Sequence, residues 1–298
     1  MAEITDDRGT RIDYVVEGAG VPALVLHGAY STRDEIMPVT GPILEGRGMR
    51  GVYPDLPGMG ESAGSSARTS DEVLDVLDAV IAAEIRDEQF VVIGHSFGAH
   101  LARGVAARHP DRVRGLALLS PFVDDFEPAP ARVVEDDGGI DALDESVRAD
   151  YLGYFVVRTA ATRDRFERFV RSSLGRYDGD VVDRIMNAST LTPDPDHAPF
   201  AGPAVVAVGR DDGLIGWRAQ RRLGDIQPRA TFVVVDGAGH ALVHERPHLV
   251  CAVLNDWLDR VERVEPVDRV ERVETVDRVD GTMASTPGPS APAARLQT

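Results

Sequence analysis

The sequence contains no lysine, and all 32 of its basic residues are arginines. A lysine Schiff base is therefore excluded as a catalytic group. The basic residues are outnumbered by 49 acidic ones, which gives a formal net charge of -17. Because a strongly acidic surface repels polyanions, this charge argues against nucleic acid and against an anionic membrane surface as partners.

Cysteine occurs only once, at Cys251, and long apolar runs are absent as well. A single cysteine forms neither an intramolecular disulfide nor a thiolate metal cluster, so we interpret Cys251 as a small core residue. No apolar run reaches the roughly 18 residues of a membrane span. The acidic start MAEITDDRGT also lacks the basic region of a signal peptide. These absences predict a cytoplasmic protein.

Apolar residues make up 43% of the 298-residue chain, which is enough for a large core. Six short and almost wholly apolar runs are typical of strands that are buried on both faces. Helical stretches lie between them, such as residues 71–85, where apolar residues recur at spacings of three and four. This alternation predicts an α/β fold with a doubly wound, mostly parallel sheet, whose ligands bind beyond the carboxyl ends of the strands. The six runs are residues 23–26, 51–53, 90–93, 116–119, 204–208 and 232–235.

The alternation stops after the fourth of these runs and resumes with the fifth. We interpret residues 121–202 as a helical cap, inserted into an α/β core that consists of residues 1–120 and 203–260. The aromatic residues scattered through the cap either line a pocket or pack the cap onto the core. A nine-residue repeat begins near residue 260, and Pro266 argues against one continuous helix there. We therefore expect residues 261–298 to be a repetitive tail without fixed structure.

Residues 94–98 read Gly-His-Ser-Phe-Gly and lie between an apolar run and a helical stretch. In a strand-turn-helix setting, the pattern G-x-S-x-G forms a sharp elbow that presents its serine in the open. A serine hydroxyl is a weak nucleophile, so it needs this exposure, an adjacent base and donors for the developing oxyanion. The pattern predicts that Ser96 is a nucleophile.

Two backbone N–H groups are expected to form the oxyanion hole. One belongs to Phe97, directly after the nucleophile, and the other to the loop after the first central strand. Gly28 lets that loop turn inward, which leaves Ala29 as the second donor. His27 stands at a strand end, so we interpret it as a structural hydrogen-bonding residue and not as a base.

The acid and the base are expected on later strand ends. Asp211 and Asp212 both follow the run that ends at residue 208, and spacing alone favours neither of them as the acid. The pair at residues 124–125 is a third candidate, although its position at the cap entrance favours solvated surface. His240 follows the last run in the sequence Gly-Ala-Gly-His, where the glycines allow its imidazole to reach back over Ser96. We predict that His240 is the base.

With these residues in the order Ser, Asp, His, the chain resembles the α/β-hydrolase superfamily over roughly residues 10–260, in particular its small capped members. In relatives with a Gly-Arg-Asp-Asp run, the second aspartate is the triad acid, so the resemblance implies Asp212. Epoxide hydrolases and haloalkane dehalogenases of this fold carry an aspartate nucleophile, and Ser96 argues against both. The matching segments are residues 26–28, 55–62, 94–98, 209–212 and 239–247.

The resemblance implies a serine hydrolase that cleaves a carboxylic ester or lactone of a hydrophobic small molecule through an acyl-enzyme. It implies no cofactor, and no residues show convincing metal-ligand spacing. Two alternatives stay open: other triad chemistry, namely carbon-carbon bond hydrolysis, acyl transfer or a cyclase or lyase step, and a ligand sensor with slow turnover. We expect an apolar substrate pocket lined by Tyr30, Met59, Tyr154, Phe155 and Trp217.

Overall fold

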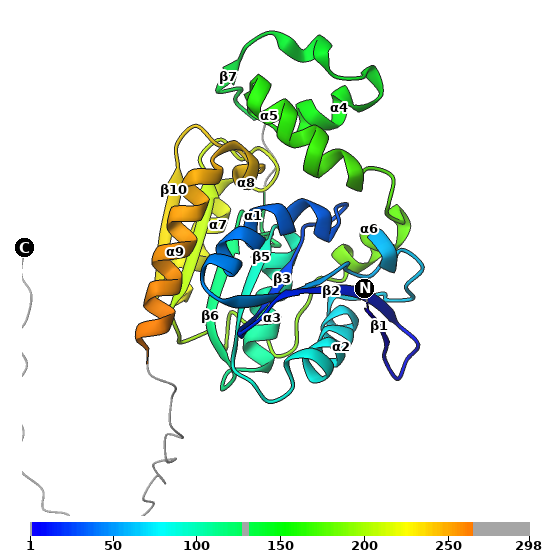
Figure 1. Ribbon diagram of the computed structural model, residues 1–298, viewed down its shortest axis with the longest axis vertical. Helices are drawn as coiled ribbons and strands as arrows, with labels where there is room; N and C mark the ends of the chain where they lie inside the picture. Colours follow the sequence, from blue (N-terminus) through cyan, green and yellow to red (C-terminus); the bar gives the residue numbers. More distant parts are fainter. Residues whose placement is uncertain (1, 127–130, 265–298) are drawn as a thin grey trace, which may run out of the picture. The chain divides into compact units, whose positions relative to one another are not determined.

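An eight-stranded sheet forms the centre of the protein (Figure 1). The computed structural model describes residues 2–126 and 131–264. The strands of this sheet are β1 (Ala2–Thr5), β2 (Arg11–Gly18), β3 (Val21–Leu26), β4 (Met49–Pro54), β5 (Phe90–His95), β6 (Val113–Leu119), β9 (Ala204–Gly209) and β10 (Ala230–Val235). Their spatial order is β1-β2-β4-β3-β5-β6-β9-β10, with β2 antiparallel to both of its neighbours and the other neighbouring strands parallel. The predicted α/β class with a mostly parallel sheet is confirmed.

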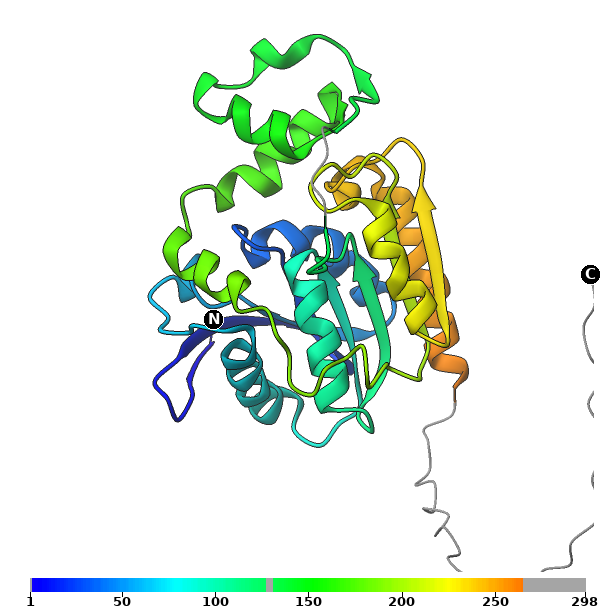
Figure 2. The ribbon, with the colours of Figure 1, turned by 180° about the vertical axis from the view of Figure 1, so that it is seen from behind.

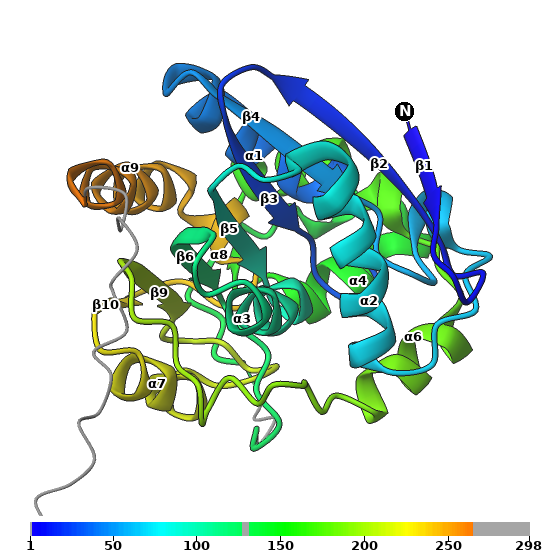
Figure 3. The same cartoon turned by 90° about the horizontal axis from the view of Figure 1, so that it is seen from below.

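Helices cover both faces of the sheet, which is why its central strands carry so few polar residues. All six residues of β5 and all six of β9 are buried. On one face lie α1 (Arg33–Gly46), α8 (Leu242–Glu245) and α9 (Pro247–Arg263). On the other lie α2 (Ser70–Val80), α3 (Phe97–Arg108) and α7 (Trp217–Ile226). Figure 3 shows α9 and α1 separated from α3 and α7 by the strands.

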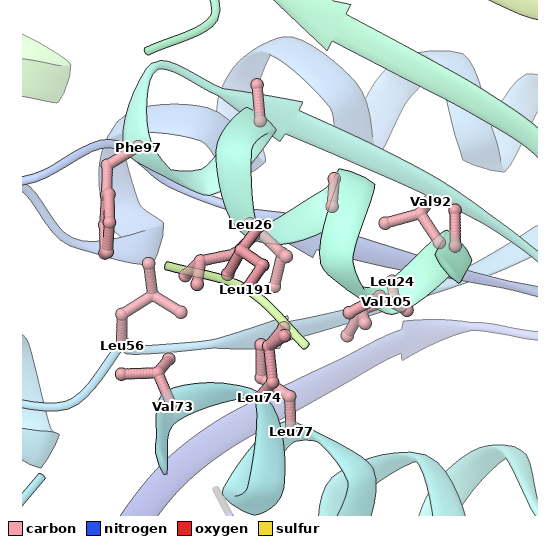
Figure 4. Packing of buried hydrophobic residues seen from close by; sticks show 14 of the residues in the cluster. Leu24, Leu26, Leu56, Val73, Leu74, Leu77, Val92, Phe97, Val105 and Leu191 are labelled. Carbon is pink, nitrogen blue, oxygen red and sulfur yellow. The ribbon is translucent and has the colours of Figure 1, made fainter. Parts of the chain in front are cut away.

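Strand β3 illustrates how one strand supplies two apolar layers. Successive side chains of a strand point to opposite faces of the sheet. Leu24 and Leu26 accordingly belong to the cluster around α2 and α3, which Figure 4 shows from close by. Ala23 and Val25 belong to the cluster under α1 and α9. Both layers are therefore anchored by the strand that leads into the predicted oxyanion loop.

The structure corrects three details of the sequence analysis. Cys251 is half-buried beside the second cluster and is not a fully buried core residue, because it lies near the solvent side of α9. The helical stretch predicted at residues 71–85 is helical throughout, but only Ser70–Val80 is an α-helix, and it continues as a π-helix, η2 (Ile81–Ile85). Residues 261–263, assigned to the tail, still belong to α9, and the tail from residue 265 onward lies outside the described residues.

Residues 121–202, here called the cap segment, contribute none of their described residues to the main sheet (Figure 2). Their elements are short and include one two-stranded pair, which the sequence did not indicate. These elements are β7 (Glu135–Asp136), η3 (Gly139–Ala142), α4 (Glu145–Tyr154), β8 (Val157–Arg158), α5 (Ala160–Arg165), η4 (Phe166–Val170), η5 (Arg171–Ser173) and α6 (Gly179–Asn187). Within residues 2–126 and 131–264, no helix combines the length and the apolar character needed to cross a membrane.

Candidate active site

Ser96 occupies a tight turn between β5 and α3. Its backbone angles, φ 51° and ψ -117°, lie in a region that residues other than glycine rarely adopt. The turn is held to the neighbouring strand because the Ser96 N–H donates to the Leu119 carbonyl at 2.9 Å. Residues 94 and 98 must be glycines because neither position has room for a Cβ. A Cβ at Gly94 would collide with the Gly98 carbonyl, and one at Gly98 would collide with the Leu26 carbonyl. Close packing against the sheet therefore stabilises the strained turn that exposes Ser96.

His240 reaches Ser96 from the loop that follows β10. Its Nε2 lies 2.9 Å from the Ser96 Oγ, and its Nδ1 lies 2.9 Å from Oδ2 of Asp212. The loop itself is held in place by the Asp211 N–H, which donates to the Ala238 carbonyl at 2.9 Å. The three side chains thus form a continuous hydrogen-bonded chain, although they come from the ends of three different strands.

Asp212 is surrounded by donors. Its Oδ1 accepts hydrogen bonds from the N–H groups of Leu214 and Ile215 at 2.9 and 3.0 Å. Its Oδ2 accepts from the Gln220 side chain at 2.8 Å, in addition to His240. A carboxylate with this many donors is fixed in orientation and stays ionised.

The other carboxylates considered as the acid are engaged elsewhere. Asp211 pairs with Arg132 of the cap segment at 2.9 Å, and Asp124 accepts a hydrogen bond from the Ser189 hydroxyl at 2.6 Å. The structure therefore places Asp212, and not Asp211 or Asp124, at the imidazole.

The protonation states of Asp212, His240 and the neighbouring His95 depend on one another. Burial lowers the pKa of His240, but the negative charge and the hydrogen bond of Asp212 outweigh it, so this pKa lies above its usual value. Burial would raise the pKa of Asp212, yet the neighbouring His240 holds it well below its usual range. Burial and the neighbouring His240 lower the pKa of His95 to about 4, so His95 is neutral at physiological pH. The arrangement can accept a proton from Ser96 at His240 and stabilise the resulting imidazolium.

The two expected oxyanion donors lie next to the nucleophile. Phe97 is the first residue of α3, so its N–H has no partner one turn earlier in the helix. The loop that carries Ala29 passes close to Ser96, since a Cβ at Gly28 would lie 3.3 Å from the Ser96 Cβ. His27 stabilises this loop because its Nδ1–H donates to the Gly28 carbonyl at 2.7 Å, while its Nε2 accepts from the Leu56 N–H at 2.8 Å. This contact agrees with the structural role inferred for His27.

Of the five residues expected to line the pocket, Tyr154 lies near His240, and two others lie against Tyr177 of the cap segment. The ring of Tyr154 lies 6.1 Å from that of His240. Tyr30 packs edge-on against Tyr177 of the cap segment at 5.4 Å. Met59 is fully buried and forms a backbone bridge with the same Tyr177.

The other two expected pocket residues have different surroundings. Phe155 is 1% exposed and packs inside the cap segment, stacked on Tyr151 at 4.9 Å. Trp217 begins α7, where the Arg218 guanidinium lies 4.7 Å from the centre of its ring. Among the described residues, no three or more histidine, cysteine, aspartate or glutamate side chains are grouped as a metal site would require.

Comparison with known proteins identifies the family. The sequence matches the family described as "alpha/beta hydrolase fold" over residues 22–247. The chain belongs to the α/β-hydrolase family. The predicted superfamily, and with it the prediction of an enzyme, is confirmed.

Two curated relatives of this hydrolase match over different lengths. A 2-hydroxymuconate semialdehyde hydrolase from Pseudomonas putida is 33% identical over 117 residues, which are 37% of this chain and only 40% of that protein. A pimeloyl-[acyl-carrier protein] methyl ester esterase from Chromobacterium violaceum is 30% identical over 207 residues, 64% of this chain and 78% of that protein.

The fold of this hydrolase is also found among solved structures. The crystal structure of an alpha/beta superfamily hydrolase from Oenococcus oeni PSU-1 superposes with a TM-score of 0.78 at 24% identity, covering 88% of this chain and 100% of that one.

Sequence reasoning missed three buried polar residues around the site of this hydrolase. Gln220 donates to Asp212, Glu245 accepts from the backbone beside His240, and Glu35 of α1 accepts from the Tyr154 hydroxyl at 2.7 Å. Burial would raise the pKa of Glu35, but the hydrogen bond and charge of His244 lower it to about 2. Glu245 lies in a segment that resembles the family, and this was the only available signal for any of the three.

Proposed function

We propose that this α/β hydrolase cleaves a carboxylic ester or lactone of a hydrophobic small molecule through an acyl-enzyme on Ser96. The observation that carries the proposal is the hydrogen-bonded chain from the Ser96 Oγ through His240 to Asp212, with 2.9 Å at each step. The partial match to a methyl ester esterase supports an ester substrate. The ring of Tyr154, 6.1 Å from that of His240, supports a hydrophobic one.

In the proposed mechanism, His240 removes the Ser96 proton as the Oγ attacks the carbonyl carbon, while Asp212 orients the imidazole and stabilises its charge. The N–H groups of Phe97 and Ala29 bind the oxyanion, and each is expected to lower the barrier by about 3 kcal/mol, on the order of a hundredfold in rate. His240 then returns the proton to the departing alkoxide. Water, deprotonated by His240, attacks the acyl-enzyme, and His240 then gives this proton to the Ser96 Oγ as the acid is released.

The test combines a covalent probe with a substrate screen. A fluorophosphonate should label the wild-type protein at Ser96 and should not label Ser96→Ala. Ser66→Ala, which alters an exposed serine, is the matched control and should label like the wild type. Esters and lactones with apolar acyl groups should then be turned over. Absence of labelling would refute the proposed nucleophile, whereas labelling without turnover of any ester or lactone would point to other triad chemistry or to a sensor.

A further inference from the structure

A second carboxylate lies behind the proposed triad. Glu245 is the last residue of α8, only 6% exposed, and follows His240 by five positions. One of its oxygens accepts a hydrogen bond from the Gly239 N–H at 2.5 Å. The other accepts from the N–H groups of Val156 and Val157 at 2.6 and 3.0 Å. One buried side chain therefore binds both the backbone directly before His240 and the β8 end of the cap segment.

The two backbone segments that Glu245 joins also pack against each other. A Cβ at Gly239 would lie 2.9 Å from a methyl carbon of Val156, so there is no free space between them. On the opposite side, the Ala238 carbonyl accepts from the Asp211 N–H at 2.9 Å. The loop before His240 is thus held between the cap segment and the loop that carries the triad acid.

The chemistry of Glu245 suits this position. Its three donors are all backbone N–H groups, and an ionised carboxylate can accept from all of them with strengthened hydrogen bonds. The bond to the Gly239 N–H holds the Ala238–Gly239 peptide group, one residue before His240, and so restricts the path by which the backbone enters His240. A displacement of about 1 Å at a catalytic group can cost on the order of a hundredfold in rate.

We propose that Glu245 is a positioning residue that holds His240 in line with Ser96 and makes this alignment depend on the docking of cap residues 156–157. The proposal rests on the proposed function, since it assigns Glu245 a role in the same reaction. It differs from a purely structural role because the expected defect lies in the chemical step and in the state of the imidazole, and not in substrate binding.

The decisive variant is Glu245→Gln, which keeps the size of the side chain but places an amide group where only acceptors fit. We expect kcat for an ester substrate to fall by about 10- to 100-fold with KM changed less than about threefold. Asp137→Asn is the matched control, because Asp137 also accepts backbone hydrogen bonds, from Gly139 and Ala160, but within the cap segment. It should leave kcat unchanged.

A second measurement does not depend on turnover. The proton on Nδ1 of His240, bound between the imidazole and Asp212, should give a low-field proton resonance in the resting protein. Glu245→Gln should shift or broaden this resonance, and Asp137→Asn should not. If the wild type shows the resonance but hydrolyses no ester, the proposed function fails while the role of Glu245 is still tested. A folded Glu245→Gln protein with unchanged kcat and resonance would overturn the inference.

Val156→Ala is the alternative test if the Glu245→Gln protein does not fold. This variant keeps the three hydrogen bonds and removes the two methyl groups that would meet a Cβ at Gly239. We expect a smaller shift of the resonance and a loss of kcat of a fewfold, because the cap residue that Glu245 holds then packs less closely against the loop before His240. An unaltered resonance and kcat in this variant would overturn the inference that the alignment of His240 depends on cap residues 156–157.

Discussion

The elements of the sheet core and of the cap segment differ in how many of their residues are buried. Every residue of β5 is buried in the core, whereas α4 of the cap segment buries only Val147 and Tyr151. Hydrophobic burial contributes about 25 cal/mol per Å² and is spread over the whole core. The cap segment is joined to the core by buried apolar side chains, among them Val182, Ile185 and Leu191 in the cluster around α2 and α3. It is also joined by polar contacts such as the one between Tyr154 and Glu35 at 2.7 Å. Each such contact contributes on the order of 1 kcal/mol.

The difference between the two regions bears on function. Ser96, Asp212 and His240 all follow strands of the core, so the strand ends bring the three groups together, while Glu245 joins the loop before His240 to the cap segment. Tyr154, whose ring lies 6.1 Å from that of His240, comes from α4 of the cap segment, which buries only two of its residues. A fold arranged in this way can alter its substrate pocket through the cap segment while the strand ends keep the catalytic groups in place. Variants in the sheet core and in the cap segment test this difference between the two regions.

Ser96→Ala should have the largest effect on activity and almost none on stability. Removing the nucleophile abolishes acyl-enzyme formation, and in serine hydrolases such a loss lowers kcat by roughly 10⁶-fold. The elbow itself is held by backbone hydrogen bonds, so the urea midpoint should stay at the wild-type value. Ester hydrolysis and urea unfolding measure the two quantities. Residual turnover above one part in a thousand would contradict the proposed role of Ser96.

Asp212→Asn should lower kcat by roughly 10⁴-fold, because the amide supports the wrong imidazole tautomer. The variant also tests the origin of the pH dependence. His240 acts as a base only when neutral, so kcat/KM of the wild type should fall as the pH drops through the pKa of His240, which lies above about 6.5. Without the negative charge of Asp212 this pKa falls, so the midpoint of the acid limb should move to lower pH. A midpoint that stays in place would show that another group titrates.

A pair of glycine substitutions compares the stability of the two regions directly. At Gly98, in the core, a Cβ would collide with the carbonyl oxygens of His27 and Leu26, so Gly98→Ala should destabilise the fold by about 1–3 kcal/mol or more. At Gly153, in α4 of the cap segment, a Cβ meets open space, so Gly153→Ala should stabilise by about 0.5–1 kcal/mol. Urea unfolding of both variants gives the two values. Equal effects at the two positions would remove the distinction between a close-packed core and an open cap segment.

Asp211→Asn should have the smallest effect. Asp211, whose side chain is 7% exposed, pairs with Arg132, which is 70% exposed, and an ion pair that is open to solvent on one side contributes little. Steady-state kinetics should give a kcat within about twofold of the wild type, in contrast to the neighbouring Asp212→Asn. A loss as large as that of Asp212→Asn would mean that Arg132 and the cap segment position the acid loop.

Much of the core could be predicted because its signals are local. The apolar runs indicated the parallel strands, and the Gly-His-Ser-Phe-Gly pattern indicated the turn at Ser96. The choice of Asp212 over Asp211 came only from the family resemblance, since both residues follow the same strand. In the cap segment, the two-stranded pair of β7 and β8 was not predicted, because four residues carry too little periodicity to indicate a strand.

By itself, the sequence determined the alternation of strands and helices and the identity of the residues at the strand ends, because burial on both faces and turn geometry depend on neighbours along the chain. Only the tertiary structure decided which distant groups meet. Gln220 at Asp212 and Glu245 at Val156, 89 residues away, have no local pattern. Their roles follow from where packing brings buried donors and acceptors together, since each buried polar group must find its partner in three dimensions.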